Sequence, residues 1–151
     1  MSVCPLRIGS LLGLLLCASA VADAATIAVT SASDDQANDG VCTLREAIVA
    51  ANTNTASGAA AGECAAGDNF NDTIAFNIPG AGVHTIHPGS PTLPSLPTVT
   101  ASVVIDGYTQ PGARTNAGSS SGTDAVLLIE ISGVNTQPGA NGLMIAGTGV
   151  T

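Results

Sequence analysis

The sequence contains no lysine, no tryptophan and very few other aromatic residues. Its three basic residues are arginines, they face 11 acids, and the net charge is −8 over 151 residues. Nucleic acids and anionic lipids are bound mainly through Lys and Arg, so we expect no nucleic-acid partner. The aromatic set is Phe70, Phe76 and Tyr108, whereas compact globular cores usually bury more rings. The composition favours a thin, layered core of Val, Ile, Leu and Ala.

A long apolar run is also missing, since a bilayer span takes about 20 residues. The longest run, Ile8 to Leu16, follows Arg7 and precedes small-x-small triplets at 18–20 and 22–24, the pattern that signal peptidase recognises. We predict a signal peptide over residues 1–24 and export to the periplasm, the outer surface or the medium, with no transmembrane span. A retained N-terminal anchor is the alternative.

Cysteine is scarce once the leader is removed, because Cys4 and Cys17 leave with it and only Cys42 and Cys64 remain. An even pair in an oxidising compartment predicts a disulfide. It would close a loop of roughly 20 residues and stabilise the fold by about 3 kcal/mol in chain-entropy estimates. Residues 55–67 are almost all Ala and Gly and have little to bury, which suits such a cross-link. A metal site would need further His or Cys ligands at ligand spacing, and these are missing.

The best-defined local element is a helix predicted over about residues 43–52. Thr43 followed by Glu46 has the spacing of a capping box, in which each side chain accepts a backbone N–H of the other residue. An apolar face is formed by residues at helical spacing, namely Leu44, Ala47, Ile48 and Ala51. We interpret Arg45 and Glu46 as a solvated or capping pair.

Beyond the helix the pattern changes to short β-like runs between Gly, Pro and Asn turns. These runs lie at 73–76, 83–86, 102–105, 126–129 and 142–145, and a further run at 26–30 precedes the helix. One short helix followed only by strands predicts a mainly β fold, in which residues 25–71 cap a stack of β-coils built from residues 72–151. A β-sandwich is the alternative. Residues 112–123 are predicted to form a flexible, protruding loop.

The segment Cys42-Thr43-Leu44-Arg45-Glu46-Ala47-Ile48, followed by Ala50-Ala51-Asn52, resembles the CSLREA-type N-terminal domain. That domain heads bacterial secreted, right-handed parallel β-helix proteins, which are typically adhesin-like or polymorphic outer-membrane-like. Thr43 stands where the family usually has Ser, a change that preserves the cap. Residues 72–76 and 104–112 also resemble segments that follow the signature. The resemblance implies a right-handed parallel β-helix, and it implies no general activity.

A β-helix needs about three stacked coils, because each coil buries its apolar face only against its neighbours. Residues 72–151 supply two or three, so we expect a truncated piece of a longer protein whose own downstream coils are its main partner. The predicted function is a surface or structural module in adhesion or cell-surface architecture, with an extracellular glycan or a host cell surface as candidate partner. We expect no catalysis of its own. The alternative is a polysaccharide-binding or polysaccharide-degrading lyase or hydrolase on the same scaffold.

A calcium site is a candidate in the loop before the helix. Asp34, Asp35, Asn38 and Asp39 offer hard oxygen ligands of the kind that Ca²⁺ prefers. Their spacing is not that of an EF-hand, and a solvated turn is the alternative. No other cofactor is expected.

Asp106 and Glu130 are candidate catalytic residues, because each follows an apolar triplet. If the triplets stack in register, the two acids lie on neighbouring coils about 4.8 Å apart, and paired acids are the machinery of glycoside hydrolases. Turn formation by Asp106-Gly107 explains one of them without any chemistry. His84 and His87 lack companions for a metal shell and are interpreted as surface or turn residues.

Overall fold

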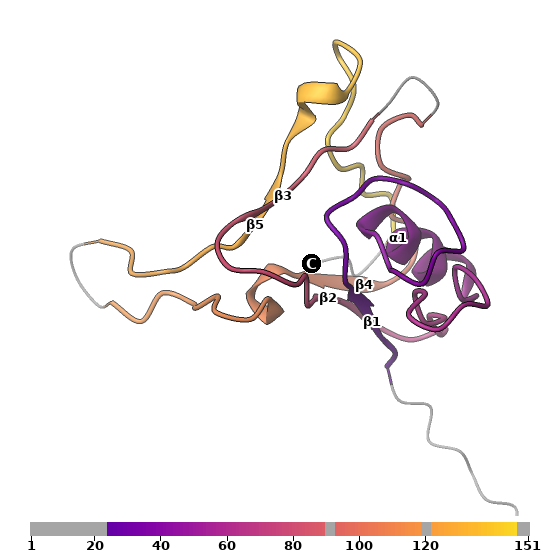
Figure 1. Cartoon of the computed structure of the whole chain (residues 1–151), viewed down its shortest axis with the longest axis horizontal. Helices are drawn as coiled ribbons and strands as arrows, with labels where there is room; N and C mark the ends of the chain where they lie inside the picture. Colours follow the sequence, from indigo (N-terminus) through magenta and orange to yellow (C-terminus); the bar gives the residue numbers. More distant parts are fainter. Residues whose placement is uncertain (1–23, 90–92, 119–121, 148–151) are drawn as a thin grey trace, which may run out of the picture.

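The computed structural model describes residues 24–89, 93–118 and 122–147 (Figure 1). Within these ranges the chain forms short strands, one α-helix and two 3-10 turns. In chain order they are β1 (Thr26–Val29), α1 (Leu44–Thr53), β2 (Asp72–Phe76), β3 (His84–Ile86), β4 (Val103–Asp106), η1 (Gly107–Thr109), β5 (Ile129–Ile131) and η2 (Gly133–Asn135). None of the helical segments in these ranges is long and apolar enough to cross a membrane. The predicted signal peptide lies outside them, apart from Ala24.

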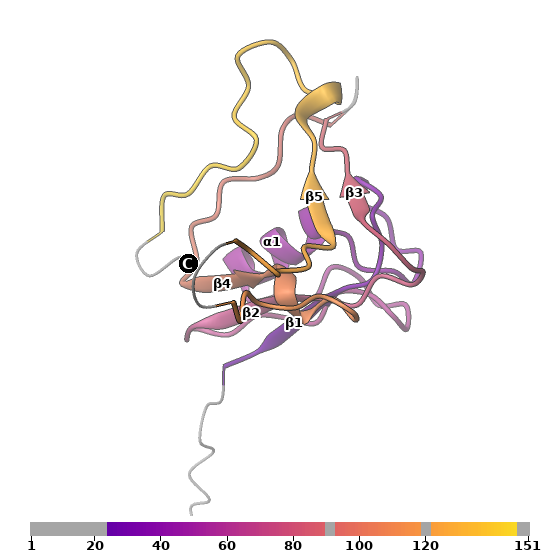
Figure 2. The ribbon, with the colours of Figure 1, turned by 90° about the vertical axis from the view of Figure 1, so that its left-hand side faces the viewer.

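The strands form two small parallel sheets. In one, β2 lies between β1 and β4; in the other, β3 pairs with β5. Val99 and Ile145 add an isolated parallel bridge. The chain therefore passes twice through the same three positions, first as β2, β3 and Val99, and then as β4, β5 and Ile145. Figure 2 shows the β1–β2–β4 sheet beneath α1, with the β3–β5 pair standing away from it.

These parallel pairings exclude the β-sandwich alternative, whose sheets are antiparallel. Four of the predicted runs are confirmed to within one or two residues, as β1, β2, β3 and β4. The run at 126–129 is placed wrongly, because β5 begins at Ile129 and Val126 instead bridges Arg114 in antiparallel fashion. The run at 142–145 is reduced to the Ile145 bridge. The predicted loop 112–123 includes residues 119–121, which lie outside the described ranges.

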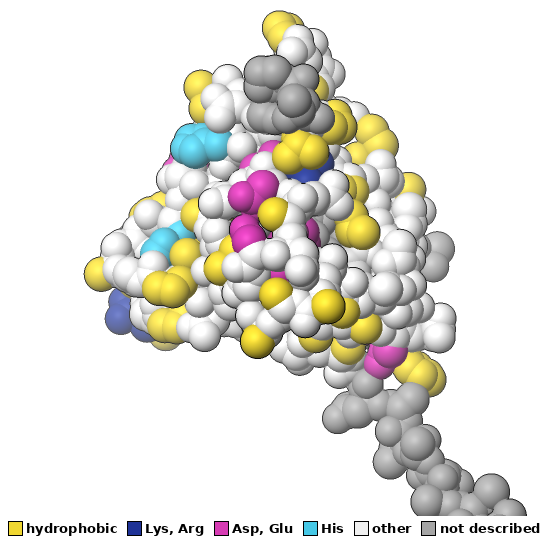
Figure 3. Space-filling view, turned by 45° about the vertical axis from the view of Figure 1, so that its right-hand side comes forward, with side chains coloured by type: hydrophobic (Ala, Val, Ile, Leu, Met, Phe, Trp, Pro, Cys, Tyr) yellow, Lys and Arg dark blue, Asp and Glu magenta, His cyan; other side chains and the backbone are white. Residues whose placement is uncertain are grey.

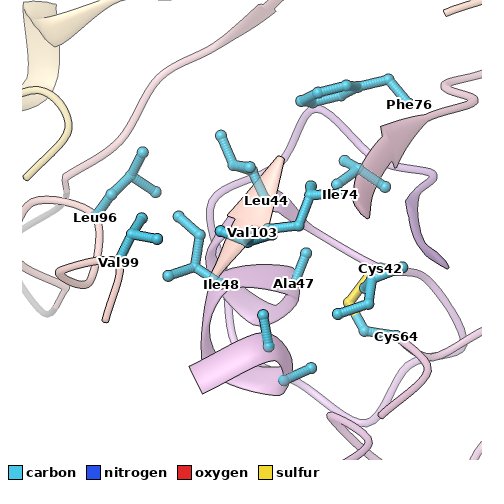
Figure 4. Packing of buried hydrophobic residues seen from close by; sticks show 14 of the residues in the cluster. Cys42, Leu44, Ala47, Ile48, Cys64, Ile74, Phe76, Leu96, Val99 and Val103 are labelled. Carbon is cyan, nitrogen blue, oxygen red and sulfur yellow. A yellow bond between two sulfur atoms is a disulfide. The ribbon is translucent and has the colours of Figure 1, made fainter. Parts of the chain in front are cut away.

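The core lies between α1 and the first sheet (Figure 4). Alternate residues of β1 and β2 point inward, so that Ile27 and Val29 of β1 pack beside Ile74 and Phe76 of β2. Val103 continues this layer in β4. Phe76 is the one aromatic ring among the buried core residues of the described chain, which confirms the prediction of an aliphatic core. The helix supplies the opposite side with Leu44, Ala47, Ile48, Ala50 and Ala51.

The capping box of the predicted helix is confirmed. The Thr43 hydroxyl accepts the Glu46 N–H at 3.2 Å, and Glu46 Oε2 accepts the Thr43 N–H at 3.0 Å. The helix ends at Asn54, which adopts the left-handed conformation with φ 52°. The solvated reading of Arg45 and Glu46 is wrong, because both residues are buried, at 2% and 3% exposure.

Side chains continue the sheet where backbone pairing stops. The Thr109 hydroxyl accepts the Phe76 N–H at 2.7 Å, just past the end of the β2–β4 ladder. The buried Gln110 amide then bonds Ile78 twice, accepting its N–H at 2.9 Å and donating to its carbonyl at 2.8 Å. Asn52 joins the end of α1 to residues 98–101 in a similar way. The Gln110 amide thus ties the two passes together, and the Asn52 amide ties the cap to the chain around Val99.

Candidate functional site

The cap is cross-linked by the predicted Cys42–Cys64 disulfide, with the two Cα atoms 4.7 Å apart. Beside it, the Glu63 carboxylate accepts the Ser57 hydroxyl at 2.6 Å and the Gly40 N–H at 2.9 Å. These bonds stabilise the ionised form, so the Ser57 hydroxyl, followed by the Gly40 N–H, lowers the pKa of Glu63. A side chain at Gly62 would collide with the Gly40 carbonyl, which explains a glycine at this close approach.

The oxygens of the predicted calcium loop hold the cap together. Asn38 Oδ1 accepts the N–H groups of Ala59 and Ala60 at 2.8 and 2.9 Å. Asp39 Oδ1 accepts the N–H of Val41 at 3.2 Å. Nowhere in the described ranges do three or more His, Cys, Asp or Glu side chains gather as a metal shell would require. The calcium site stays a prediction: the oxygens of Asn38 and Asp39 are engaged by the backbone, whereas Asp35 Oδ1 is buried without a hydrogen-bond partner.

Asp34, the first acid of that loop, forms a buried ion pair that the sequence reasoning missed. Asp34 binds Arg45 through two bonds of 2.8 Å, and the two side chains are only 7% and 3% exposed. Arg45 also donates to the carbonyls of Pro94 and Ser95, at 2.6 and 3.2 Å. Asp34 Oδ2 accepts the Gly89 N–H at 2.8 Å. The pair therefore fastens the cap to the segment that follows β3.

Asp106 and Glu130 are not stacked as the catalytic prediction required. Their strands belong to different sheets: Asp106 lies opposite Ala75, and Glu130 lies opposite Thr85. Asp106 Oδ1 accepts the Tyr108 N–H at 2.9 Å and begins η1, which is the turn role considered as the alternative. Glu130 Oε2 accepts the Thr85 hydroxyl at 2.7 Å. Each acid thus has a local structural partner.

Two hollows in the described chain lie close to candidate acids. One of about 260 Å³ is lined by Asp106 together with Ile105, Gly107, Tyr108 and Leu127–Ile129. Its lining does not include Glu130. The other, of about 320 Å³, lies in the cap and contains Glu46, whose two oxygens are already engaged by the N–H groups of Ala37 and Thr43. Neither hollow joins a pair of acids.

The two histidines lie in different environments. His87 is exposed, as predicted. His84 is half-buried in β3 opposite Ile129, and its Nε2 atom is buried without a hydrogen-bond partner. The prediction of a surface position is therefore wrong for His84.

Asp72, which the sequence reasoning did not single out, is fully buried at the start of β2. Its carboxylate accepts the Asp68 N–H at 3.1 and 3.2 Å and the Ala25 N–H at 3.3 Å. Burial is the main cause that raises the pKa of Asp72, and the Asp68 carboxyl adds to it. A side chain at Gly67 would collide with Asp72 Oδ2, so the pocket is tight. The alternation of strand residues could have revealed its burial, because Asp72 lies two residues before Ile74 and shares the inward face with it.

Comparisons with known proteins return no match: no family model, no curated protein and no solved structure is similar to the chain. The resemblance to the CSLREA-type domain remains a prediction from the residues that carry it. The geometry described above is therefore the main basis for a functional proposal.

Proposed function

We propose that the chain is an exported structural module: the N-terminal cap and first coils of a parallel β-helix that serves adhesion or cell-surface architecture. The observation that carries the proposal is the repeated path of the chain. Two successive passes meet in parallel at three places, through β2 with β4, β3 with β5, and Val99 with Ile145. A coil that returns to the same three positions is the repeating unit of such a stack.

At the end of the stack next to β1 the cap covers the apolar core, although within the described residues β1 itself pairs only with β2. Helix α1 packs on β1 and β2, and the Cys42–Cys64 disulfide and the Arg45–Asp34 pair fix the loops around it. Capping units of repeat proteins need this arrangement, because the first coil has no preceding coil to cover its core.

The opposite end is open. Within the described residues, β4 pairs only with β2 and β5 only with β3, so each strand has one free edge. Large apolar side chains are exposed along the second pass, namely Leu127, Ile131, Val134, Leu143, Met144 and Ile145. Free edges and exposed apolar groups together favour the addition of another strand layer. A further β-coil on this end would pair the edges and bury those side chains.

The charged groups support a structural role. The acids of the cap serve in structure: Asp34 binds Arg45, Glu46 caps the helix, and Glu63 holds a turn. Figure 3 shows one face on which acidic side chains gather while basic ones are few. A surface of this charge does not attract phosphates or anionic lipids.

Export and display are tested by an epitope inserted at the exposed turn 79–82 between β2 and β3. We expect an antibody to bind the tag in intact cells, or after the outer membrane is opened. We also expect an alkylating reagent to find no free thiol at Cys42 or Cys64. A control insertion in a cytosolic protein of the same cells must stay inaccessible. A tag found in the cytosol, on a chain whose Cys42 and Cys64 are both reduced, would contradict the proposal.

The open end is tested by self-association of the exported chain. Leu127→Ser with Val134→Ser should lower the sedimentation-measured association, since both side chains are exposed on the second pass. Phe70→Ser is the matched control, because Phe70 is also exposed but precedes β2. Equal association of the double variant and the control would argue against an adhesive open end.

A further inference from the structure

Asp72 is a buried carboxylate without a basic side chain beside it. The two ion pairs in the described part of the chain join Arg45 to Asp34 and Arg114 to Asp124, so neither arginine serves Asp72. The N–H groups of Ala25 and Asp68 donate to it, and, beyond its burial, the neighbouring Asp68 carboxyl, which has the same sign of charge, further raises the pKa of Asp72. Burying a carboxylate without a cation is costly. A positive charge at this place would stabilise the fold.

The N–H that approaches Asp72 from the β1 side belongs to Ala25. Ala25 is half-buried, its nitrogen lies 3.3 Å from Asp72 Oδ1, and its carbonyl accepts the Thr73 N–H at 2.8 Å. The residue is therefore held by β2 on both sides of its Cα. Ala24, one residue earlier, is exposed. The chain passes from solvent into the fold between these two alanines.

We propose that removal of the leader between Ala24 and Ala25 creates an α-ammonium group that forms an ion pair with buried Asp72 and locks β1 onto β2. The proposal rests on the export proposed above, since the small-x-small triplet 22–24 directs cleavage to this bond. The precursor presents only an amide N–H to Asp72. The processed chain presents a full positive charge at the same atom.

The chemistry is an amide hydrolysis by signal peptidase. Water adds across the Ala24–Ala25 bond, the C–N bond breaks, and the leader leaves with a carboxylate on Ala24. Ala25 keeps a primary amine, which takes up a proton near neutral pH. An opposite charge at this distance favours the ionised form of both partners. The ammonium thus removes the charge imbalance that burial of Asp72 creates.

The sequence makes the test unusually direct, because it has no lysine. When residues 25–151 are produced behind this leader, the amine of Ala25 is the single primary amine of the processed chain. N-terminal sequencing of the exported chain should first give Ala25-Thr26-Ile27. The rate of acylation by an N-hydroxysuccinimide ester at pH 7 then reports how much of the amine is unprotonated.

We expect Asp72→Asn to raise that acylation rate about tenfold. This is the increase in unprotonated amine that follows when the pKa of the amine falls by about one unit. Asp68→Asn is the matched control, because it removes the neighbouring carboxylate and leaves Asp72 in place; its rate should stay near that of the wild type or fall below it. In denaturant all three proteins should react alike. Equal rates for the folded wild type and Asp72→Asn would overturn the proposal.

A second measurement needs no change at Asp72. Acetylating the amine of the wild-type protein should lower its melting temperature at pH 7, because the positive charge is lost. The ion pair is present between the pKa of Asp72 and the ordinary pKa of the amine, and it is lost as the pH rises through the raised pKa of the amine, so the difference should vanish at pH 10. Equal melting at pH 7 would overturn the ion pair. An N-terminus other than Ala25 would instead refute the processing step, and a chain found in the cytosol would refute export itself.

Discussion

The two passes of the chain differ sharply in burial although they have the same backbone path. The hydrophobic core is drawn from residues 27–103, so that the second pass contributes only Val103 to it, and Gln110 is the last buried residue. Among the described residues from 111 to 147, none is buried. The first pass is enclosed by the cap and by the second pass, whereas in the described part of the chain the second pass has a paired neighbour on one side only. The burial of a segment in this arrangement depends more on whether another pass of the chain covers it than on how apolar its sequence is.

The two ion pairs repeat the contrast. Arg45 and Asp34 form a buried, two-bond pair. Arg114 and Asp124 approach to only 3.9 Å, and their side chains are 60% and 47% exposed. Because water screens the second pair and not the first, the same residue types should contribute very differently to stability.

The largest expected effect comes from breaking the buried pair. Arg45→Met leaves Asp34 buried and unpaired, so we expect a loss of roughly 3–5 kcal/mol in the free energy of unfolding. Arg114→Met, the matched change in the exposed pair, should cost about 0–1 kcal/mol. Chemical denaturation of both variants measures the difference. Equal losses of unfolding free energy in the two variants would contradict the contrast between a buried pair in the cap and a solvated pair in the second pass.

A matched pair of leucines tests the same contrast without charge. Leu44 is fully buried and Leu127 is 65% exposed. Leu44→Ala should destabilise the protein by about 3 kcal/mol through lost burial and a residual cavity. Leu127→Ala should change stability by about 0.5 kcal/mol or less. A large loss at Leu127, read from the same denaturation curves, would show that the second pass is covered in solution.

The helix cap should have a smaller effect. Thr43→Ala removes the hydroxyl that accepts the Glu46 N–H and should cost about 1 kcal/mol. Thr53→Ala at the exposed end of α1 is the control, since its hydroxyl bonds only to the Val49 carbonyl one turn earlier and should be close to neutral. Thermal melts compare the two. Similar losses would mean that the capping box does not organise the cap.

The smallest expected effect is a pH dependence at Glu63. Its pKa is lowered in the folded state by the Ser57 hydroxyl and the Gly40 N–H. A lowered pKa contributes stability that is present above the ordinary value of 4.5 and is lost as the pH falls through the lowered value. Glu63→Gln should therefore lose less stability than the wild type between pH 5 and pH 3. Identical acid sensitivity in thermal melts would be the contrary result.

Local features were predictable from the sequence, and pairings between distant segments were not. The Thr43–Glu46 cap depends on residues three apart, and the disulfide pair followed from a count of cysteines. The burial of Arg45 depends on Pro94 and Ser95, about 50 residues away, which no local pattern reveals. The expected stacking of Asp106 on Glu130 failed for a similar reason, because their strands lie in different sheets.

Amide hydrogen exchange on the purified protein tests the central claim most directly. The account predicts slow exchange for the paired amides of β1, β2 and α1, and faster exchange throughout residues 122–147, where a covering layer is missing. The contrast should persist at low protein concentration, where association is suppressed. Protection of residues 122–147 equal to that of β2 in the dilute, monomeric protein would contradict a closed cap end and an open far end.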